Sequence, residues 1–188
     1  LLYRSTFGPQ PNSYQELENL GYINWLDKQF SAVPSLHSTR LKSYPLEADK
    51  DTYNQADRVA VWWDISINAP DQLRQRVAFA LSEIFVISRY GASLGGRALE
   101  MTDYYDMLIK HAFGNYRDLI ESVTLHAAMG DYLSMMANQK ADPESNRFPD
   151  ENYAREVMQL FSIGLYELNS DGTEKLGSQG QLIPTYSI

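Results

Sequence analysis

The chain has 188 residues, 44% of them hydrophobic, and its 24 acidic and 16 basic residues give a net charge of −8. A chain of this length can bury roughly 70% of the surface that its unfolded form exposes, so it can fold without disulfides or a structural metal. The negative charge argues against a nucleic-acid partner, the absence of cysteine excludes thiolate metal sites and cysteine nucleophiles, and no apolar run approaches the roughly 20 residues of a membrane span.

Two short helices are predicted near the beginning of the chain. Ser13 and Glu16 have the spacing of a capping box, which predicts a helix that begins at Ser13 and ends at Gly21. A second helix should cover residues 22–30. Residues 31–53 contain two prolines, several serines and a charged cluster, a composition that predicts a long surface loop.

The middle of the chain predicts the helices of the core. A helix over residues 54–68 carries an apolar stripe, and a second helix over residues 70–89 is apolar around most of its girth, as is typical of a buried helix. The expected stripes consist of Val59, Trp62, Trp63 and Ile67 on the first helix and of Leu73, Val77, Ala80, Leu81, Ile84 and Ile87 on the second.

Four further helical segments are predicted, over residues 100–113, 115–126, 127–137 and 149–164. After Gly164, an Asp-Gly pair between two arms of alternating residues predicts a β-hairpin. The expected fold is all-α: one bundle-like domain of seven or eight helices over residues 1–188, with a small C-terminal β-hairpin and extended tail over residues 165–188.

Four polar residues are the candidates for a catalytic cleft: Glu156, Asn152, Arg76 and His111. Asn152 and Glu156 share a polar stripe of the 149–164 helix, where the first could orient a substrate and the second serve as a base or ligand. A solvated face with a helix–helix hydrogen bond explains the same stripe without chemistry. Arg76 lies at the edge of an apolar helix and is expected to pair with a carboxylate, because an unpaired buried charge costs several kcal/mol. The candidates for that carboxylate are Glu83, Glu156 and Asp118.

Motifs for metals, cofactors and nucleophiles are missing from the sequence. None of the three histidines has the spacing of a helical zinc site, and no serine-nucleophile or phosphate-binding glycine motif occurs. Residues 167–172 faintly echo a calcium loop, but Ser178 would stand at the position of the bidentate glutamate. No cofactor and no metal site is therefore predicted.

Several segments of the chain, in order, resemble the DUF1800 family of bacterial proteins of unknown function. The matching pieces are residues 1–9, 25–30, 72–79, 111–119 and 151–164. The most specific is Glu151-Asn152-Tyr153-Ala154-Arg155-Glu156, which is similar to the family's Asn-Glu-Asn-Phe-Ala-Arg-Glu-Leu signature, with Asp150 in place of the first Asn. The resemblance implies an N-terminal fragment of a longer, exported protein, periplasmic or extracellular. It implies no established activity and no catalytic residues.

Two functions remain open from the sequence. The first is a non-catalytic helical module that supports or binds a partner, which could be another protein or the missing C-terminal part of the same chain. The second is part of a hydrolase acting on an extracellular polymer, with Glu156, Asn152, Arg76 and His111 in one cleft. The enzymatic hypothesis requires these side chains to line a pocket within hydrogen-bond reach of a substrate.

Overall fold

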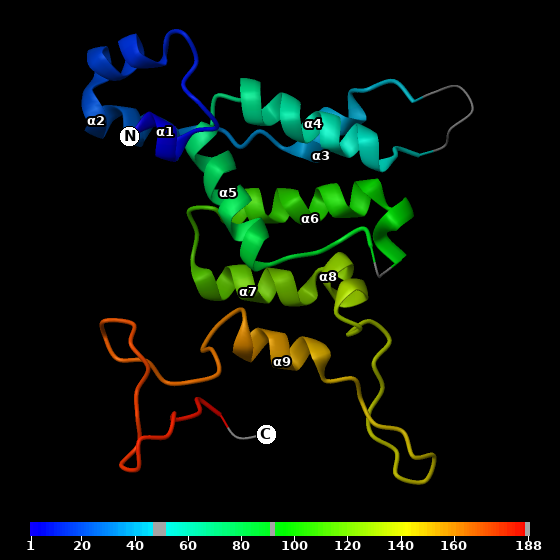
Figure 1. Cartoon of the computed structure of the whole chain (residues 1–188). Helices are drawn as coiled ribbons and strands as arrows, with labels where there is room; N and C mark the ends of the chain where they lie inside the picture. Colours follow the sequence, from blue (N-terminus) through cyan, green and yellow to red (C-terminus); the bar gives the residue numbers. More distant parts are fainter. Residues whose placement is uncertain (47–51, 91–92, 187–188) are drawn as a thin grey trace. The chain divides into compact units, whose positions relative to one another are not determined.

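The structure is a computed structural model that describes residues 1–46, 52–90 and 93–186 (Figure 1). Over these residues the chain is helical, with nine α-helices and a short 3-10 helix, and no β-strand. The chain divides into two compact units, residues 1–132 and residues 133–188, which are described separately below. Within the described part of the chain, no helix has the length and apolar character needed to cross a bilayer.

Helix α6 is the central element of the first unit. In Figure 1, α6 runs between α4 and α7, and it packs against α3, α4, α5, α7 and α8. Its buried residues include Met101, Tyr104, Leu108 and Ile109, whose spacings of three, four and one place them along one side of the helix. The helices of this unit are α1 (Leu2–Ser5), α2 (Ser13–Ser31), α3 (His37–Lys42), α4 (Gln55–Asn68), α5 (Gln72–Ile84), α6 (Ala98–His111), α7 (Tyr116–Leu125) and α8 (Ala127–Tyr132), with the 3-10 helix at Ser93–Gly96.

Helix α2 begins where the sequence predicts, but not by the predicted cap. Asn12 is the N-cap residue, and the Ser13 hydroxyl accepts a hydrogen bond from the Gln10 backbone N–H at 2.9 Å. The break predicted at Gly21 is confirmed, because this residue has φ 73° and interrupts the helical geometry. A positive φ is accessible to glycine without steric cost, so the two halves of α2 join at this point.

Helix α3 was missed within the predicted loop over residues 31–53. It has no side-chain cap of its own, and its first two backbone N–H groups, those of His37 and Ser38, donate instead to the Asp106 carboxylate at 2.7 and 3.0 Å. Because Asp106 lies on α6, about 70 residues away, the local sequence contains no signal for this start. Residues 47–51 of the predicted loop lie outside the described residues.

Helix α4 confirms the predicted helix but not its buried face. Asn54 caps it, and Asp57 completes a capping box. Its buried apolar residues are Val61 and Ile65, which form a core cluster with Leu41 and Ala69. The predicted stripe is largely exposed: Val59, Trp63 and Ile67 are on the surface, and Trp62 is half-buried. The reason is α3, since Leu41 of this unpredicted helix packs against the other side of α4.

Helix α5 buries polar residues where an apolar face was expected. Arg74 and Gln75 are buried beside Ala78, whereas the stripe that includes Leu73, Val77 and Leu81 is half-buried. The helix ends at Ile84 instead of residue 89, and Phe85 then enters the core. The side of α5 that faces α6 is therefore set by hydrogen bonds, as described below.

In residues 133–186 the second unit has one helix, α9 (Asn152–Gln159), which is shorter than the predicted 149–164 helix. Tyr153 and Phe161 are its buried aromatic residues, and Gly164 adopts φ 74°. After α9 the backbone hydrogen bonds no longer follow the α-helical pattern, in which an N–H donates to the carbonyl four residues before it. The Gly164 N–H donates instead to the carbonyl of Met158, six residues before it.

The prediction of a C-terminal β-hairpin is wrong, because the described residues after Gly164 form isolated bridges and no strands. Residues 165–186 form a turn at Asp171-Gly172, with a bridge between Leu168 and Glu174, and two more isolated bridges, Leu176 with Leu182 and Tyr166 with Pro184. The leucines of the arms, at positions 165, 168 and 176, are exposed. Without a buried face to hold the register, the arms do not extend into a ladder. The count of seven or eight helices is likewise corrected to nine in the described residues.

Candidate functional site

Arg76 does not pair with a carboxylate among the described residues. It lies on α5, half-buried, with its guanidinium over the rings of Phe7 at 5.3 Å and Phe79 at 5.6 Å. Asp118, one of its predicted partners, lies within 3.9 Å of Arg117. The buried arginine of this helix is Arg74, two residues earlier, so the sequence assigned the buried cation to the wrong position on the helix.

His111 joins α6 to α7. Its Nε2 atom shares a hydrogen bond of 2.9 Å with the Ser122 hydroxyl, and both residues are half-buried. A serine–histidine pair has the composition of a nucleophile and its base, but neither residue lines either of the two pockets described below. The contact therefore acts as a helix–helix hydrogen bond.

Asn152 and Glu156 lie one turn apart on α9, in the second unit, and both are half-buried. Arg76 and His111 belong to the first unit. Between described residues, the structure records no hydrogen bond or ion pair that joins any two of the four candidates. The cleft formed by Glu156, Asn152, Arg76 and His111 stays a prediction.

Arg155, on the same helix, forms an exposed ion pair. Its Nη2 atom lies 2.9 Å from Glu151 Oε1, and the two side chains are 45% and 71% exposed. Replacing Arg155 with alanine is expected to lower the free energy of unfolding by about 0.5 kcal/mol or less, because water screens exposed pairs. Urea denaturation measures this change. A loss of about 3 kcal/mol would show instead that the guanidinium bridges buried groups.

A buried polar network connects α3, α5 and α6. The Gln75 amide donates to Asp71 Oδ2 at 3.0 Å and to the Ser35 carbonyl at 2.9 Å, which leaves its oxygen to accept from His37 Nε2 at 3.1 Å. Asp71 Oδ2 also accepts from the Ser35 N–H at 2.9 Å. Together with Asp106, this network holds the chain before α3 against the other two helices.

His37 is expected to make the stability of the first unit depend on pH. Its pKa is lowered from the ordinary value near 6.5, chiefly by burial, and also by the charge of Arg58, although Gln75, Asp106 and Asp71 oppose the shift. The unfolded chain therefore binds a proton that the folded chain resists, so stability is present above about pH 6.5 and declines as the pH falls below that value.

Urea denaturation at pH 7.5 and pH 5.5 measures this dependence, and the His37→Gln variant isolates it from the carboxylates. We expect the decrease in stability between the two pH values to be smaller in the variant than in the parent. His126, whose pKa burial also lowers, keeps part of the dependence in both proteins. An identical decrease in parent and variant would exclude His37 as a source.

The first pocket has a volume of about 560 Å³ and lies among α4, α5, α6 and the segment after α5. This volume is within the range of about 300–1,000 Å³ that small-molecule sites occupy. Aromatic rings form much of its wall, and the charged groups on it are two arginines and one glutamate. The lining residues that matter below are Arg58, Trp62, Glu83, Arg89, Tyr90 and Tyr105.

The two arginines of this pocket lack carboxylate partners among the described residues. Arg58 Nε donates to Gln55 Oε1 at 2.7 Å, and Arg89 donates to the Tyr90 hydroxyl. Burial lowers the pKa of Arg58, and the positive charge of Arg89 lowers it further, which indicates that the two cations lie within electrostatic reach of each other. The wall of the pocket thus carries two positive charges, from the arginines, and one negative charge, from Glu83, although the net charge of the chain is −8.

Tyr105 adds a further hydrogen-bond donor to the wall. Its hydroxyl accepts from Trp62 Nε1 at 3.1 Å, and its own proton is donated to no residue that the structure describes. Burial raises the pKa of Tyr105 to about 12, so the hydroxyl keeps that proton at physiological pH. The aromatic pocket is therefore rich in donors, with Glu83 as its one acidic side chain.

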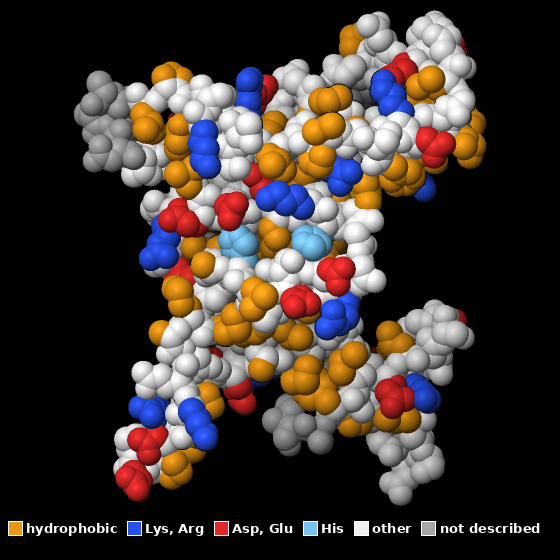
Figure 2. Space-filling view, turned by 180° about the vertical axis from the view of Figure 1, so that it is seen from behind, with side chains coloured by type: hydrophobic (Ala, Val, Ile, Leu, Met, Phe, Trp, Pro, Cys, Tyr) orange, Lys and Arg blue, Asp and Glu red, His pale blue; other side chains and the backbone are white. Residues whose placement is uncertain are grey.

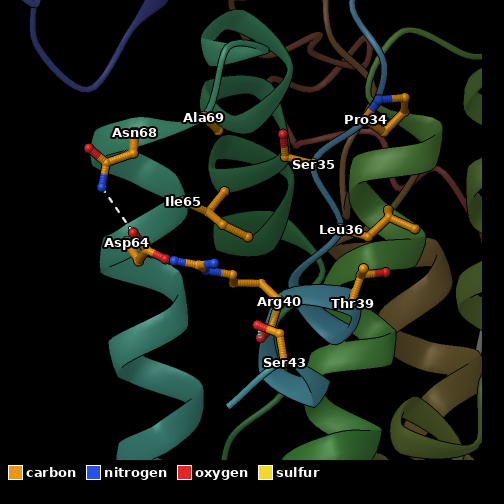
Figure 3. A pocket seen from close by; sticks show the side chains of 10 residues that line it. All are labelled: Pro34, Ser35, Leu36, Thr39, Arg40, Ser43, Asp64, Ile65, Asn68 and Ala69. Atoms are coloured by element: carbon orange, nitrogen blue, oxygen red, sulfur yellow. Dashed lines mark hydrogen bonds and ion pairs between the residues drawn. The ribbon is translucent and has the colours of Figure 1, made fainter.

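A second pocket, of about 510 Å³, lies between α3 and α4. Figure 3 shows Arg40 extending from α3 toward Asp64 on α4, with Asn68 one turn further along the same helix. Unlike the first pocket, this one contains a cation and an anion in direct contact, so its charges cancel.

The comparison with known families concerns almost the whole chain. The family described as "Protein of unknown function (DUF1800)" matches residues 1–181 of the 188. The chain belongs to the DUF1800 family. The resemblance read from the sequence is thus confirmed, and the chain is a helical module of a family whose function is unknown. No curated protein and no solved structure matches it.

The described residues of this DUF1800 chain contain no cluster of three or more His, Asp or Glu side chains that could hold a metal ion. In the calcium-like segment, Asp171 Oδ1 accepts from the Thr173 N–H and hydroxyl at 3.0 and 2.7 Å. These bonds stabilise the turn and lower the pKa of Asp171.

On the face of the DUF1800 chain drawn in Figure 2, Lys and Arg side chains lie singly among Asp, Glu and hydrophobic ones. No continuous basic patch of the kind that binds nucleic acid is visible on that face.

Neither pocket was predicted from the sequence. The one local signal for the aromatic pocket was Arg58 and Trp62, four residues apart and hence on one side of α4. The rest of its wall comes from α5, the segment after it and α6. The second pocket depends on α3, a helix that was not predicted.

Proposed function

We propose that this chain is a ligand-binding module whose aromatic pocket binds an anionic group through Arg58 and Arg89. One observation carries the proposal: two guanidinium groups lie on the wall of one pocket, and neither pairs with a carboxylate among the described residues. Arg58 is half-buried and Arg89 is exposed. A partly buried cation such as Arg58 that the protein does not neutralise is favourably neutralised by a ligand. Arginine binds carboxylate and phosphate groups with strong, often bidentate hydrogen bonds.

The aromatic wall favours an anion that is attached to a planar or apolar group. Trp62, Phe79, Tyr90 and Tyr105 supply ring surfaces beside the two arginines. Inorganic phosphate alone would use the charges but not this apolar surface. An aryl phosphate or aryl carboxylate uses both.

Binding of phenyl phosphate tests the proposal. The quenching of tryptophan fluorescence and isothermal titration calorimetry both report it, because Trp62 lines the pocket. We expect saturable binding of phenyl phosphate, weaker binding of inorganic phosphate, and a loss of about tenfold or more in affinity in Arg58→Gln or Arg89→Gln, since a hydrogen bond between charged groups contributes about 1.5–3 kcal/mol. Removing the opposing charge in Glu83→Gln should strengthen binding.

Arg97→Gln is the matched control. This substitution also removes one positive charge, but Arg97 is exposed and does not line the pocket. It should leave the affinity within about twofold of the parent, as screening weakens distant charges. Equal weakening in Arg97→Gln and Arg58→Gln, or no saturable binding of phenyl phosphate and benzoate, would contradict the proposal.

Neither the family match nor the pockets support the hydrolase hypothesis. The exported location, periplasmic or extracellular, remains a proposal from the family resemblance, and it is tested by whether a tagged form of the protein is secreted.

A further inference from the structure

The pocket between α3 and α4 has a fixed apolar floor. Four of its lining residues are apolar, and two of these, Ile65 and Ala69, belong to the buried core cluster with Leu41 and Val61. The remaining apolar residues of the wall are Pro34 and Leu36 (Figure 3). An aliphatic group of a ligand would therefore meet a preformed surface.

An ion pair crosses this pocket. Arg40 Nε lies 2.5 Å from Asp64 Oδ2, and Asn68 Nδ2 donates to Asp64 Oδ1 at 2.9 Å (Figure 3). The hydrogen bonds from Arg40 and Asn68 hold the pKa of Asp64 below its ordinary value, so the carboxylate stays charged at neutral pH. One wall of the pocket thus presents a positive and a negative group side by side.

Several polar groups on this wall keep hydrogen-bonding capacity. Arg40 donates through Nε to Asp64, and its guanidinium also interacts with Tyr44, 5.8 Å from the centre of that ring. A guanidinium has five N–H donors, so these two neighbours do not use all of them. The Asn68 side-chain oxygen and the hydroxyls of Ser35 and Thr39, which also line the pocket, make no hydrogen bond to another described residue. The donors of this wall lie on the arginine, and the oxygens without a described partner lie on Asn68, Ser35 and Thr39.

We propose that this pocket binds a small zwitterion, an α-amino acid with an aliphatic side chain. The ligand carboxylate would accept from the Nη groups of Arg40, and its ammonium group would donate to Asp64 and to the neighbouring oxygen of Asn68. The side chain would lie on Ile65, Ala69 and Leu36. In an α-amino acid one carbon separates the two charged groups, and this compact arrangement matches two protein charges in direct contact.

Ligands of other charge fit this pocket less well. A simple anion would be attracted by Arg40 but repelled by the adjacent Asp64 carboxylate. A simple cation would be attracted by Asp64 but repelled by Arg40. A neutral ligand would leave both charges without a new partner. The paired charges thus select for a ligand that carries both signs.

Three probes that share the same isobutyl group test this inference: L-leucine, 3-methylbutylamine, which lacks the carboxylate, and 4-methylpentanoate, which lacks the ammonium group. Backbone amide shifts in ¹H–¹⁵N NMR spectra of the whole chain report both affinity and position. We expect saturable shifts on addition of L-leucine in residues 35–43 and 64–69, with the amine and the acid each binding at least about tenfold more weakly. Glycine should also bind more weakly than L-leucine, because it does not reach the apolar floor.

Arg40→Gln and Asp64→Asn should each weaken L-leucine binding by about tenfold or more. Arg117→Gln, which removes one member of an exposed ion pair with Glu121 on α7, is the control and should bind L-leucine as the parent does. Because the Arg40–Asp64 pair is partly exposed, the melting temperatures of the variants should remain close to that of the parent. Unchanged melting temperatures would show that the variants lose binding without losing the fold.

Equal binding of all three probes would show that the floor alone binds them, and would overturn the inference. The absence of saturable shifts with L-leucine, or shifts that persist in Arg40→Gln and Asp64→Asn, would also overturn it. The Arg58→Gln variant should bind L-leucine normally, since Arg58 lines the other pocket.

Discussion

Replacing Arg74 with alanine should lower the free energy of unfolding by about 3 kcal/mol or more. Arg74 is only 9% exposed, and its two Nη atoms each lie 3.4 Å from a backbone carbonyl, one of Ile109 and one of Phe30. Its guanidinium also lies 4.5 Å from the centre of the Phe113 ring. The two carbonyls belong to the last turns of α6 and α2, where helix dipoles concentrate negative charge.

The alanine variant loses these interactions together and leaves a cavity between three helices. Arg74→Met keeps most of the aliphatic stem, so it separates the loss of hydrogen bonds from the loss of packing, and its effect should be smaller. Urea denaturation, monitored by circular dichroism, measures all three proteins.

Arg76→Ala is the matched control for Arg74. Arg76 is two residues away on α5, half-buried, and interacts with the rings of Phe7 and Phe79. Its removal should cost about 1 kcal/mol, the scale of a partly exposed cation–π interaction. Equal losses in Arg74→Ala and Arg76→Ala would refute the assignment of Arg74 as the cation that links α2 and α6.

Replacing Asp106 with alanine should be similarly damaging, at about 3 kcal/mol. The carboxylate is 1% exposed, and its two oxygens accept from the backbone N–H groups of His37 and Ser38 at 2.7 and 3.0 Å. The variant would leave both donors without an acceptor at the start of α3. Hydrogen exchange at residues 37–42 should therefore accelerate more than exchange in α7.

Asp103→Ala provides the comparison on the same helix. Asp103 is one turn before Asp106, its side chain is 67% exposed, and it lies 3.4 Å from His126 Nε2. Its replacement should change stability by about 0.5 kcal/mol or less. If Asp106→Ala were equally mild, α3 would have to be held by contacts other than this carboxylate.

The residues of the buried network explain why the polar interior was not predicted. Helical periodicity identifies the apolar side of α5, but the hydrogen bonds of Asp71 and Gln75 place the polar side inside. Their partners, Ser35 and His37, lie nearly 40 positions earlier in the chain. A polar side chain can be buried only when such partners are in place, and sequence periodicity does not reveal them.

Local signals were sufficient where the cause of a structure lies within a few residues. Asn54 and Asp57 begin α4, Asn115 caps α7, and Gly21 breaks α2, each through a contact or a dihedral angle of its own segment. The same holds for the Arg155–Glu151 pair, which one helical turn brings together. Family membership belongs here as well, because it depends on the order of short segments.

The helical class, the caps and breaks of individual helices and the DUF1800 family were all determined by the sequence itself, because each depends on neighbouring residues or on their order. The tertiary structure alone decided which side of α4 and α5 is buried, how α3 begins, and that the arms after Gly164 do not form strands. It also brought Arg58 and Arg89 to the wall of one pocket, and Arg40 into an ion pair with Asp64. Those outcomes depend on groups from distant parts of the chain that only packing brings into contact.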